Sequence, residues 1–419
     1  MMPADLLIHS IKQLYTQNHL PPVRGKCMSD IRIIDDAYVA ITGERILSYG
    51  SGDYREHLGD ATVMIDATGL IMLPGLIDSH THLVHGGSRE DEFSLKLQGV
   101  PYLEILRQGG GILNTVAKTK AASFADLYAQ ARDSLDEMLL YGVTTIEAKS
   151  GYGLNLATEI KQLEVAKKLD QDHPIDIIST YLGAHALPNE YHNDKPGFIA
   201  KVIKDLGEIK RLGLADYVDV FCEKGIFELD DTRVIIEKAR ELGLKPRLHA
   251  DEMHTLGGAG LGIAYQAASV DHLIAISDTD IDKLGSSNTI ANLLPATSFF
   301  LNKDYAPARK LIDHDAAVAI ASDYNPGSTP SENFQLTMQL AGNKLGMYPA
   351  EILTASTINP AFNLALAADR GSIQTGKRAD LVLMKAKNLD YLIYHYGINH
   401  TVHVFKNGKQ VVKDRHLIY

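Results

Sequence analysis

Residues 123–149 read SFADLYAQARDSLDEMLLYGVTTIEAK, a segment of helix length that leads directly into a short apolar run. Runs of this kind are typical of strands that are buried on both faces of a parallel sheet. The pattern repeats eight times between about residue 73 and residue 364, in GLIDSH, VTTIEAK, IDIISTYLGAH, YVDVFCE, PRLHADE, ASVDHL, TIANLLP and AVAIASD. Eight strands separated by helices predict a (β/α)8 barrel of the TIM type. An open doubly wound sheet is the alternative, although no GxGxxG motif follows an early strand.

The two ends of the chain have a different sequence pattern, which is typical of β-strands without helices. Residues 1–72 contain short strand-like runs without helices, among them DAYVAITGERILSYG with a predicted turn at Thr42 and Gly43. The last part returns to the same pattern in HTVHVFKNGKQVV, where Asn407 and Gly408 predict a hairpin turn. We therefore predict one small β-sandwich domain built from residues 1–72 and 365–419, beside a barrel of residues 73–364.

Composition excludes several classes of protein. The chain has 419 residues, 45% of them hydrophobic, and carries 41 Lys and Arg against 52 Asp and Glu, a net charge of -11. This is globular rather than disordered, and it disfavours nucleic acid as a partner. There is no signal-peptide pattern and no apolar run of about 18 residues, so we expect a cytoplasmic protein without membrane partners. Only two cysteines are present, Cys27 and Cys222, so any metal must be held by histidines and carboxylates.

Polar residues gather where the predicted strands end, and in a barrel these ends meet at one face. The endings are His80, Thr81 and His82; His185; His249, Asp251 and Glu252; Asp271 and His272; and Asp323.

A metal site is the first reading of this set. His80 and His82 are two residues apart on an extended strand, so both side chains lie on the same side. Alone, the HxH motif is weak, since such pairs also occur as structural or exposed histidines. His249 and Asp323 add a third imidazole and a carboxylate from separate strands. This donor set suits Zn2+, with Fe2+ also compatible.

Glu252 and His272 are the candidates for proton transfer. A metal lowers the pKa of bound water to about 7, but a nearby base must still accept and relay the proton. Glu252 follows His249 by three residues, and His272 ends the next predicted strand. The alternatives are a solvated loop carboxylate for Glu252 and a core histidine for His272.

Other residues are weaker candidates. Gly109, Gly110 and Gly111 resemble a phosphate-binding loop, but no GK[ST] follows, which favours a flexible lid or a turn. His85 could add a ligand, although its position beyond the strand favours a supporting or exposed role. Lys149 and Lys224 raise the alternative of a carbamylated lysine that bridges two metals. We interpret the site as mononuclear.

At DSHTHLVHGGSR, residues 78–89, and GSIQTGKRADLVL, residues 371–383, the chain resembles the amidohydrolase superfamily. The segments EAKSGYGL (147–154), YLGAHALP (181–188), LHADE (248–252), SVDHL (269–273) and SDYNPGS (322–328) resemble the imidazolonepropionase family within it. The resemblance extends over nearly the whole chain. The HGGSR and KSGYGL segments are more specific than HxH, because related deaminases share the metal residues but not these two segments.

The resemblance implies hydrolysis of 4-imidazolone-5-propanoate to N-formimidoyl-L-glutamate in histidine degradation, by a homodimer with one divalent metal ion per chain. It implies His80, His82, His249 and Asp323 as metal ligands, and Glu252, His272 and Asp323 as catalytic residues. It also implies that Arg89 binds the substrate carboxylate and that Tyr152, His185 and Glu252 contact substrate. Asn325, Gly327 and Ser328 would line the place of the glutamate product. His85 departs from the family pattern, in which an aromatic residue is more frequent.

Two other functions stay open at this point. One is an amino-heterocycle deaminase of the same superfamily, which would release ammonia. The other is a noncatalytic binding protein that keeps the barrel, against which the complete ligand set and Glu252 argue.

Overall fold

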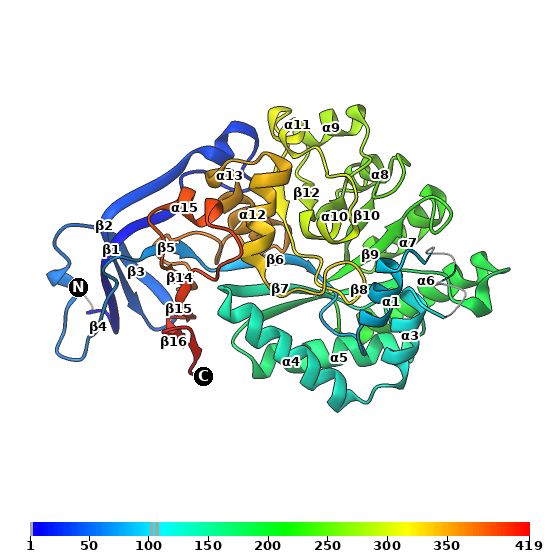
Figure 1. Cartoon of the computed structure of the whole chain (residues 1–419), viewed down its shortest axis with the longest axis horizontal. Coiled ribbons are helices and arrows are strands. Elements are labelled where there is room, and N and C mark those ends of the chain that lie inside the picture. The colour runs from blue at the N-terminus through cyan, green and yellow to red at the C-terminus, as the bar shows by residue number, and fades with distance from the viewer. Residues whose placement is uncertain (1–2, 101–103, 105–108) are drawn as a thin grey trace.

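The protein is described by a computed structural model covering residues 3–100, 104 and 109–419. Its centre is the predicted barrel (Figure 1), in which eight parallel strands follow one another in chain order. The strands are β6 (Leu76–Thr81), β7 (Val143–Lys149), β8 (Asp176–Ala184), β9 (Tyr217–Cys222), β10 (Lys245–Ala250), β11 (Ser269–His272), β12 (Ile290–Leu293) and β13 (Val318–Ile320). This order confirms the barrel and excludes the open doubly wound sheet.

The barrel closes through the residues that follow β13. The ladder between β13 and β6 is replaced by two hydrogen bonds, from Asp323 N to His80 O at 3.0 Å and from His82 N to Tyr324 O at 2.8 Å. The side chain of Asp78 completes the seam, because it accepts a hydrogen bond from Ser322 N at 2.9 Å. The closure therefore brings Asp323 directly beside the HxH segment.

Helices cover the outside of the barrel. In the segment that predicts the fold, Ser123 and Asp126 form a reciprocal capping box, which fixes the start of the first long helix. The helices are α4 (Phe124–Leu140), α5 (Leu156–Asp172), α6 (Lys195–Leu212), α7 (Leu229–Glu241), α8 (Gly258–Ala264), α9 (Asp278–Gly285), α10 (Pro295–Leu301), α11 (Ala308–Asp313), α12 (Phe334–Leu345), α13 (Pro349–Ser356) and α14 (Ile358–Asn363). Their apolar faces and the strands share one large hydrophobic core.

Both chain ends build a second, separate sheet, as predicted. It has nine strands in the order β17-β16-β15-β14-β5-β1-β2-β3, with β4 paired to β1. The strands are β1 (Leu6–Gln17), β2 (Ile31–Thr42), β3 (Arg45–Ser51), β4 (Val63–Asp66), β5 (Ile71–Pro74), β14 (Leu381–Met384), β15 (Thr401–Lys406), β16 (Lys409–Lys413) and β17 (His416–Leu417), with the short helix α15 (Leu389–Tyr394) after β14. We propose the domain boundaries near residues 72 and 364; β5 crosses the first of them, because its ladder with β14 continues to Pro74.

The two predicted hairpin turns have different outcomes. Lys406 pairs with Lys409, so Asn407 and Gly408 form the turn, both with positive φ. At the other hairpin Thr42 pairs with Arg45, so the turn residues are Gly43 and Glu44. The prediction of Thr42 and Gly43 was therefore wrong by one residue, because Thr42 is the last residue of the ladder.

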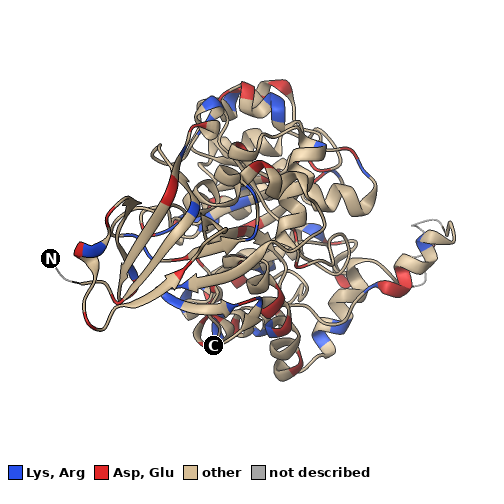
Figure 2. Cartoon of the chain, turned by 60° about the vertical axis from the view of Figure 1, so that its left-hand side comes forward, with Lys and Arg blue, Asp and Glu red and all other residues tan. Residues whose placement is uncertain are grey.

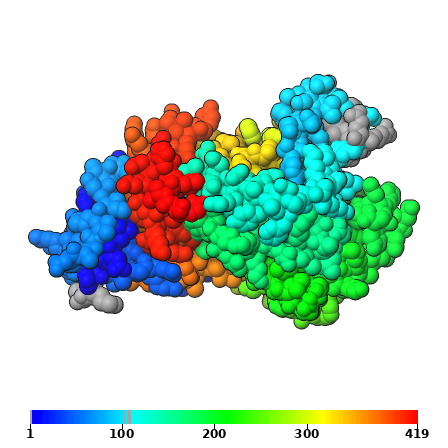
Figure 3. All heavy atoms as spheres, turned by 90° about the horizontal axis from the view of Figure 1, so that it is seen from below, coloured from blue at the N-terminus to red at the C-terminus, as the bar shows by residue number. Residues whose placement is uncertain are grey.

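Two helices, α1 (Glu90–Leu97) and α3 (Ile112–Ala121), follow the HxH strand, and the α1 segment stands out from the body of the molecule (Figure 3). Acidic and basic residues alternate over the helices visible in Figure 2 and form no single basic face in that view. Within residues 3–100, 104 and 109–419, no helix has the length and hydropathy that a bilayer crossing requires.

Candidate metal centre and active site

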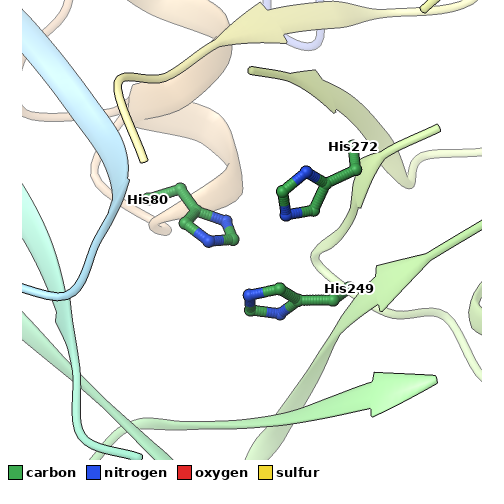
Figure 4. Close-up of side chains that lie close together, drawn as sticks. All are labelled: His80, His249 and His272. Atoms are coloured by element: carbon green, nitrogen blue, oxygen red, sulfur yellow. The ribbon is translucent and has the colours of Figure 1, made fainter. Parts of the chain in front are cut away.

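Histidine side chains from four barrel strands converge at the carboxyl ends of those strands. Three overlapping groups have ligand atoms within 4.8 Å of one another: His80 with His249 and His272, His82 with His185 and His249, and His80 with His82 and Asp323. Figure 4 shows the rings of His80, His249 and His272 turned toward one another. All four predicted ligands thus lie in one cluster, and His185 and His272 border it.

Asp323 faces both histidines of the HxH motif. Its Oδ1 lies 3.5 Å from Nε2 of His80 and 3.5 Å from Nε2 of His82. Its Oδ2 accepts a hydrogen bond of 2.6 Å from Thr297 Oγ1. Asp323 and His272 both have positive φ, of 56° and 75°, a strained conformation that concentrates at functional sites.

Two of the predicted histidine ligands, and His185 beside them, are kept in the state that binds metal. Burial lowers the pKa of His80 well below its ordinary value, with the Lys149 charge as the next cause. Burial also lowers the pKa of His82 and His185, so these imidazoles are neutral. Metal ions bind neutral imidazole and carboxylate. Nε2 of His80 is buried without a hydrogen-bond partner among the described residues, so the donor set fits a divalent metal.

Two buried carboxylates lie behind the cluster and orient two of its imidazoles. Nδ1 of His80 is 2.6 Å from Asp271 Oδ2, and Nδ1 of His249 is 3.0 Å from Asp219 Oδ2. Burial lowers the pKa of His249, but Asp219 outweighs burial and raises it above the ordinary value. Carboxylates in this position fix the tautomer of a ligating histidine and leave Nε2 for the metal.

Glu252 and His272 lie together at the edge of the cluster. Glu252 Oε2 is 3.6 Å from His272 Nε2, and its side chain is 18% exposed while that of His272 is 3% exposed. The loop that carries Glu252 is anchored by buried Glu223, which accepts a 2.9 Å hydrogen bond from Met253 N. Glu252 is therefore the more accessible of the two groups.

Arg89 precedes α1 and points back toward the β13 loop. Its Nε donates a 2.9 Å hydrogen bond to Thr115 Oγ1. The guanidinium packs against Gly327 so closely that a Cβ at residue 327 would be 2.3 Å from Arg89 Nη1. The predicted carboxylate clamp and the predicted product loop are therefore in contact.

Tyr152 and His185 form an aromatic wall beside His82. The His185 ring stacks on the His82 ring with centroids 5.0 Å apart, and the Tyr152 ring lies 5.4 Å from His185. The Tyr152 loop is held by buried Glu159, whose carboxylate accepts hydrogen bonds of 2.7 to 2.8 Å from the amides of Gly151, Gly153 and Leu154.

Known proteins are similar to this chain over its full length, and a family model matches its second half. A family model described as "Amidohydrolase family" matches residues 228–412. The chain is 50% identical to an imidazolonepropionase of Alkaliphilus oremlandii over 100% of both chains. It is 49% identical to one of Fusobacterium nucleatum, over 98% of this chain and 100% of the other.

The chain belongs to the imidazolonepropionase family.

Solved structures with the same fold are more distant in sequence. An adenosine deaminase from Xanthomonas campestris with bound zinc has a TM-score of 0.73 at 18% identity, over 100% of this chain and 95% of that one. Guanine deaminase of E. coli also has a TM-score of 0.73, at 14% identity, over 97% and 98% of the two chains. This imidazolonepropionase family member therefore shares its barrel with deaminases.

The side chain of Asn325 is used within its own loop. Its Nδ2 donates to Asp323 O at 2.6 Å and to Ser328 Oγ at 2.7 Å, while Oδ1 accepts from the amides of Gly327 and Ser328 at 2.8 Å. In this family member Asn325 shapes the loop. It positions Gly327 and Ser328, the other two residues that were predicted to line the place of the product.

Four weaker candidates lie outside the cluster. His85 is buried, 3.1 Å from Gly87 O through Nδ1, and burial lowers its pKa to about 4. Gly111 N donates to Glu92 Oε1 at 3.0 Å, so the Gly109–Gly111 segment is anchored to α1.

The two lysines that could have carried a bridging carbamate lie in different surroundings. Lys224 is exposed. Lys149 Nζ lies 2.8 Å from Glu147 and 2.7 Å from Asp219, a setting that suits an ammonium and not a negatively charged carbamate.

Several residues of the site were missed by sequence reasoning. Asp219 interrupts the apolar run YVDVFC and is completely buried. A carboxylate within an apolar strand could have indicated a paired residue near the site, because buried acids are nearly always paired. Thr115 and Glu159 carried no signal, since ordinary helix residues acquire their partners only when the loops fold over the barrel.

Proposed function

We propose that this chain hydrolyses 4-imidazolone-5-propanoate to N-formimidoyl-L-glutamate. The observation that carries the proposal is the buried cluster of histidines with Asp323, flanked by Glu252 and His272, in a chain 50% identical over its full length to an imidazolonepropionase. Water adds its oxygen to the ring carbonyl carbon, the ring C–N bond breaks, and a proton passes to the leaving nitrogen.

We propose that His80, His82, His249 and Asp323 hold one divalent metal ion. Nitrogen donors with one carboxylate favour zinc, and iron is the second choice. When bound, the ion supplies Lewis-acid polarisation of the ring carbonyl and a lowered pKa for water. The support in this chain is the lowered pKa of His80 and His82 and the carboxylates behind His80 and His249.

We assign proton transfer to Glu252, His272 and Asp323. Glu252 is partly exposed and accepts the proton of the attacking water, and His272, 3.6 Å from it, relays protons. The second carboxylate oxygen of Asp323, Oδ2, accepts hydrogen bonds from Thr297 Oγ1 and Ser328 Oγ. In this proposal it combines metal ligation with proton delivery to the leaving nitrogen.

The substrate is bound at its two ends. Arg89 pairs the propanoate carboxylate with its two terminal nitrogens, a geometry that a lysine cannot supply. Tyr152 and His185 contact the ring, together with Glu252. Gly327 and Ser328, shaped by Asn325, line the place of the product. A homodimer, expected from the resemblance, stays part of the proposal and is measured by light scattering in solution.

The test is product identification with the purified protein. We expect the absorbance of 4-imidazolone-5-propanoate to decay with formation of N-formimidoyl-L-glutamate by mass spectrometry. Release of ammonia from cytosine or guanine, with no turnover of imidazolonepropanoate, would instead identify a deaminase. No turnover of any ring, in protein that contains metal, would identify a binding protein.

A further inference from the structure

A cluster of charged side chains lies inside the barrel, behind the histidines. Its members are Glu147, Lys149, Asp219, Arg247 and Asp271, and the side chain of each is 0% exposed. Taking five charges out of water is costly unless each has close partners. The cluster therefore demands an explanation beyond packing.

Lys149 is the cation in close contact with these carboxylates. Its Nζ is 2.8 Å from Glu147 Oε1, 2.7 Å from Asp219 Oδ2 and 3.8 Å from Asp271 Oδ2. Arg247 lies 3.9 Å from both Glu147 Oε1 and Asp271 Oδ2, about as far from Asp271 as Lys149 is. It donates instead to the backbone oxygen of Ser79 at 2.8 Å.

The oxygens near Lys149 are the same ones that hold the histidines. Asp219 Oδ2 is 3.0 Å from His249 Nδ1, and Asp271 Oδ2 is 2.6 Å from His80 Nδ1. One ammonium thus spans two carboxylate–histidine pairs that come from four different strands. At 2.7 Å the ammonium fixes the Asp219 oxygen, which then has little freedom to turn away from His249. At 3.8 Å it acts on Asp271 through its charge alone.

We propose that Lys149 is a positioning residue that holds Asp219 by direct contact and attracts Asp271 through its charge, so that His249 and His80 present Nε2 to the metal. The inference rests on the proposed metal site. It assigns part of the metal affinity to a residue that touches neither the metal nor the substrate.

The experiment compares Glu147→Gln with the double variant Glu147→Gln/Lys149→Met. Glu147 contacts Lys149 but neither histidine nor Asp219, so the single variant is the matched control. The double variant removes one charge of each sign and leaves both histidine carboxylates in place. Zinc dissociation constants are measured on the metal-free, full-length proteins by competition with a chromophoric chelator, which requires no catalytic turnover.

We expect zinc to bind the double variant about 10- to 100-fold more weakly than the single variant, the usual effect of losing a partner of a metal ligand. Thermal melting of the metal-free proteins distinguishes this positioning role from a purely structural one. A purely structural role would lower the melting temperature without changing the zinc dissociation constant. Equal affinity in the two variants overturns the proposal. If the parent itself binds no zinc, the metal site of the proposed function fails as well.

A second double variant keeps the test decisive if the protein with Lys149→Met does not fold. Glu147→Gln/Lys149→Gln retains a buried hydrogen-bond donor but is too short to span both carboxylates. Its zinc affinity should be intermediate, at least about 3-fold below that of Glu147→Gln, because one of the two carboxylates loses its support. Affinity equal to that of Glu147→Gln again overturns the role of Lys149.

Discussion

Gly327→Ala tests whether the β13 loop and Arg89 act together on the substrate carboxylate. A Cβ at residue 327 would lie 2.3 Å from Arg89 Nη1 and 2.8 Å from Cζ, where ordinary contact begins at 3.4 Å. The guanidinium must therefore retreat by about 1 Å, a displacement large enough to break an aligned charge-assisted pair. The backbone itself tolerates alanine, because Gly327 does not have a positive φ.

The expected loss follows from the bond that is disturbed. A hydrogen bond to a charged group contributes about 1.5 to 3 kcal/mol, so kcat/KM should fall by about 10- to 150-fold. Most of the change should be in KM, since the carboxylate is remote from the ring C–N bond. Gly207→Ala is the matched control, because a Cβ there meets nothing within 4 Å.

A double-mutant cycle with Arg89→Met decides whether the effect passes through Arg89. If it does, Gly327→Ala should cause little further loss once Arg89 is gone, and an analogue without the carboxylate should be insensitive to both changes. An equal loss in the presence and absence of Arg89 would refute the reasoning and assign Gly327 to the shape of the Asp323 loop alone.

Two further predictions concern proton transfer and stability. Glu252→Gln should keep its metal and bind an unreactive substrate analogue normally while turnover falls about 100- to 10,000-fold; loss of metal would mean that Glu252 is a ligand. Burial lowers the pKa of His173 to about 4, although the nearby Asp136 carboxylate acts in the opposite direction. The Nδ1 atom of His173 accepts a 3.0 Å hydrogen bond from Ile175 N. The unfolded chain therefore binds more protons between pH 6.5 and 4, so the free energy of unfolding should fall by about 3 kcal/mol as pH drops through this window. Denaturation of the parent and of His173→Asn at pH 7 and pH 4 should show a smaller loss in the variant, and equal losses would contradict the assignment to His173.

The barrel could be predicted because its strands are buried on both faces. Each therefore appears as a short apolar run, and all eight runs are strands of the structure. The period of two along an extended strand also placed His80 and His82 on one side, and their rings lie 5.5 Å apart. Local rules of this kind need no knowledge of distant contacts.

Contacts that depend on the assembled barrel could not be predicted. Asp219, Lys149 and Asp271 lie on three different strands, and their mutual distances follow from strand register and barrel closure. The bond from Arg89 to Thr115 spans two helices whose relative position no local pattern encodes. The sequence identified the strand-end chemistry, while the residues that orient it emerged only from the folded chain.

The most direct test of the central claim is a titration of metal-free protein with Zn2+ while hydrolysis of 4-imidazolone-5-propanoate is recorded. The account predicts that activity rises in proportion to added metal and reaches its plateau at one equivalent per chain. Full activity without metal would contradict the mechanism, and a plateau at two equivalents would contradict the single site formed by His80, His82, His249 and Asp323.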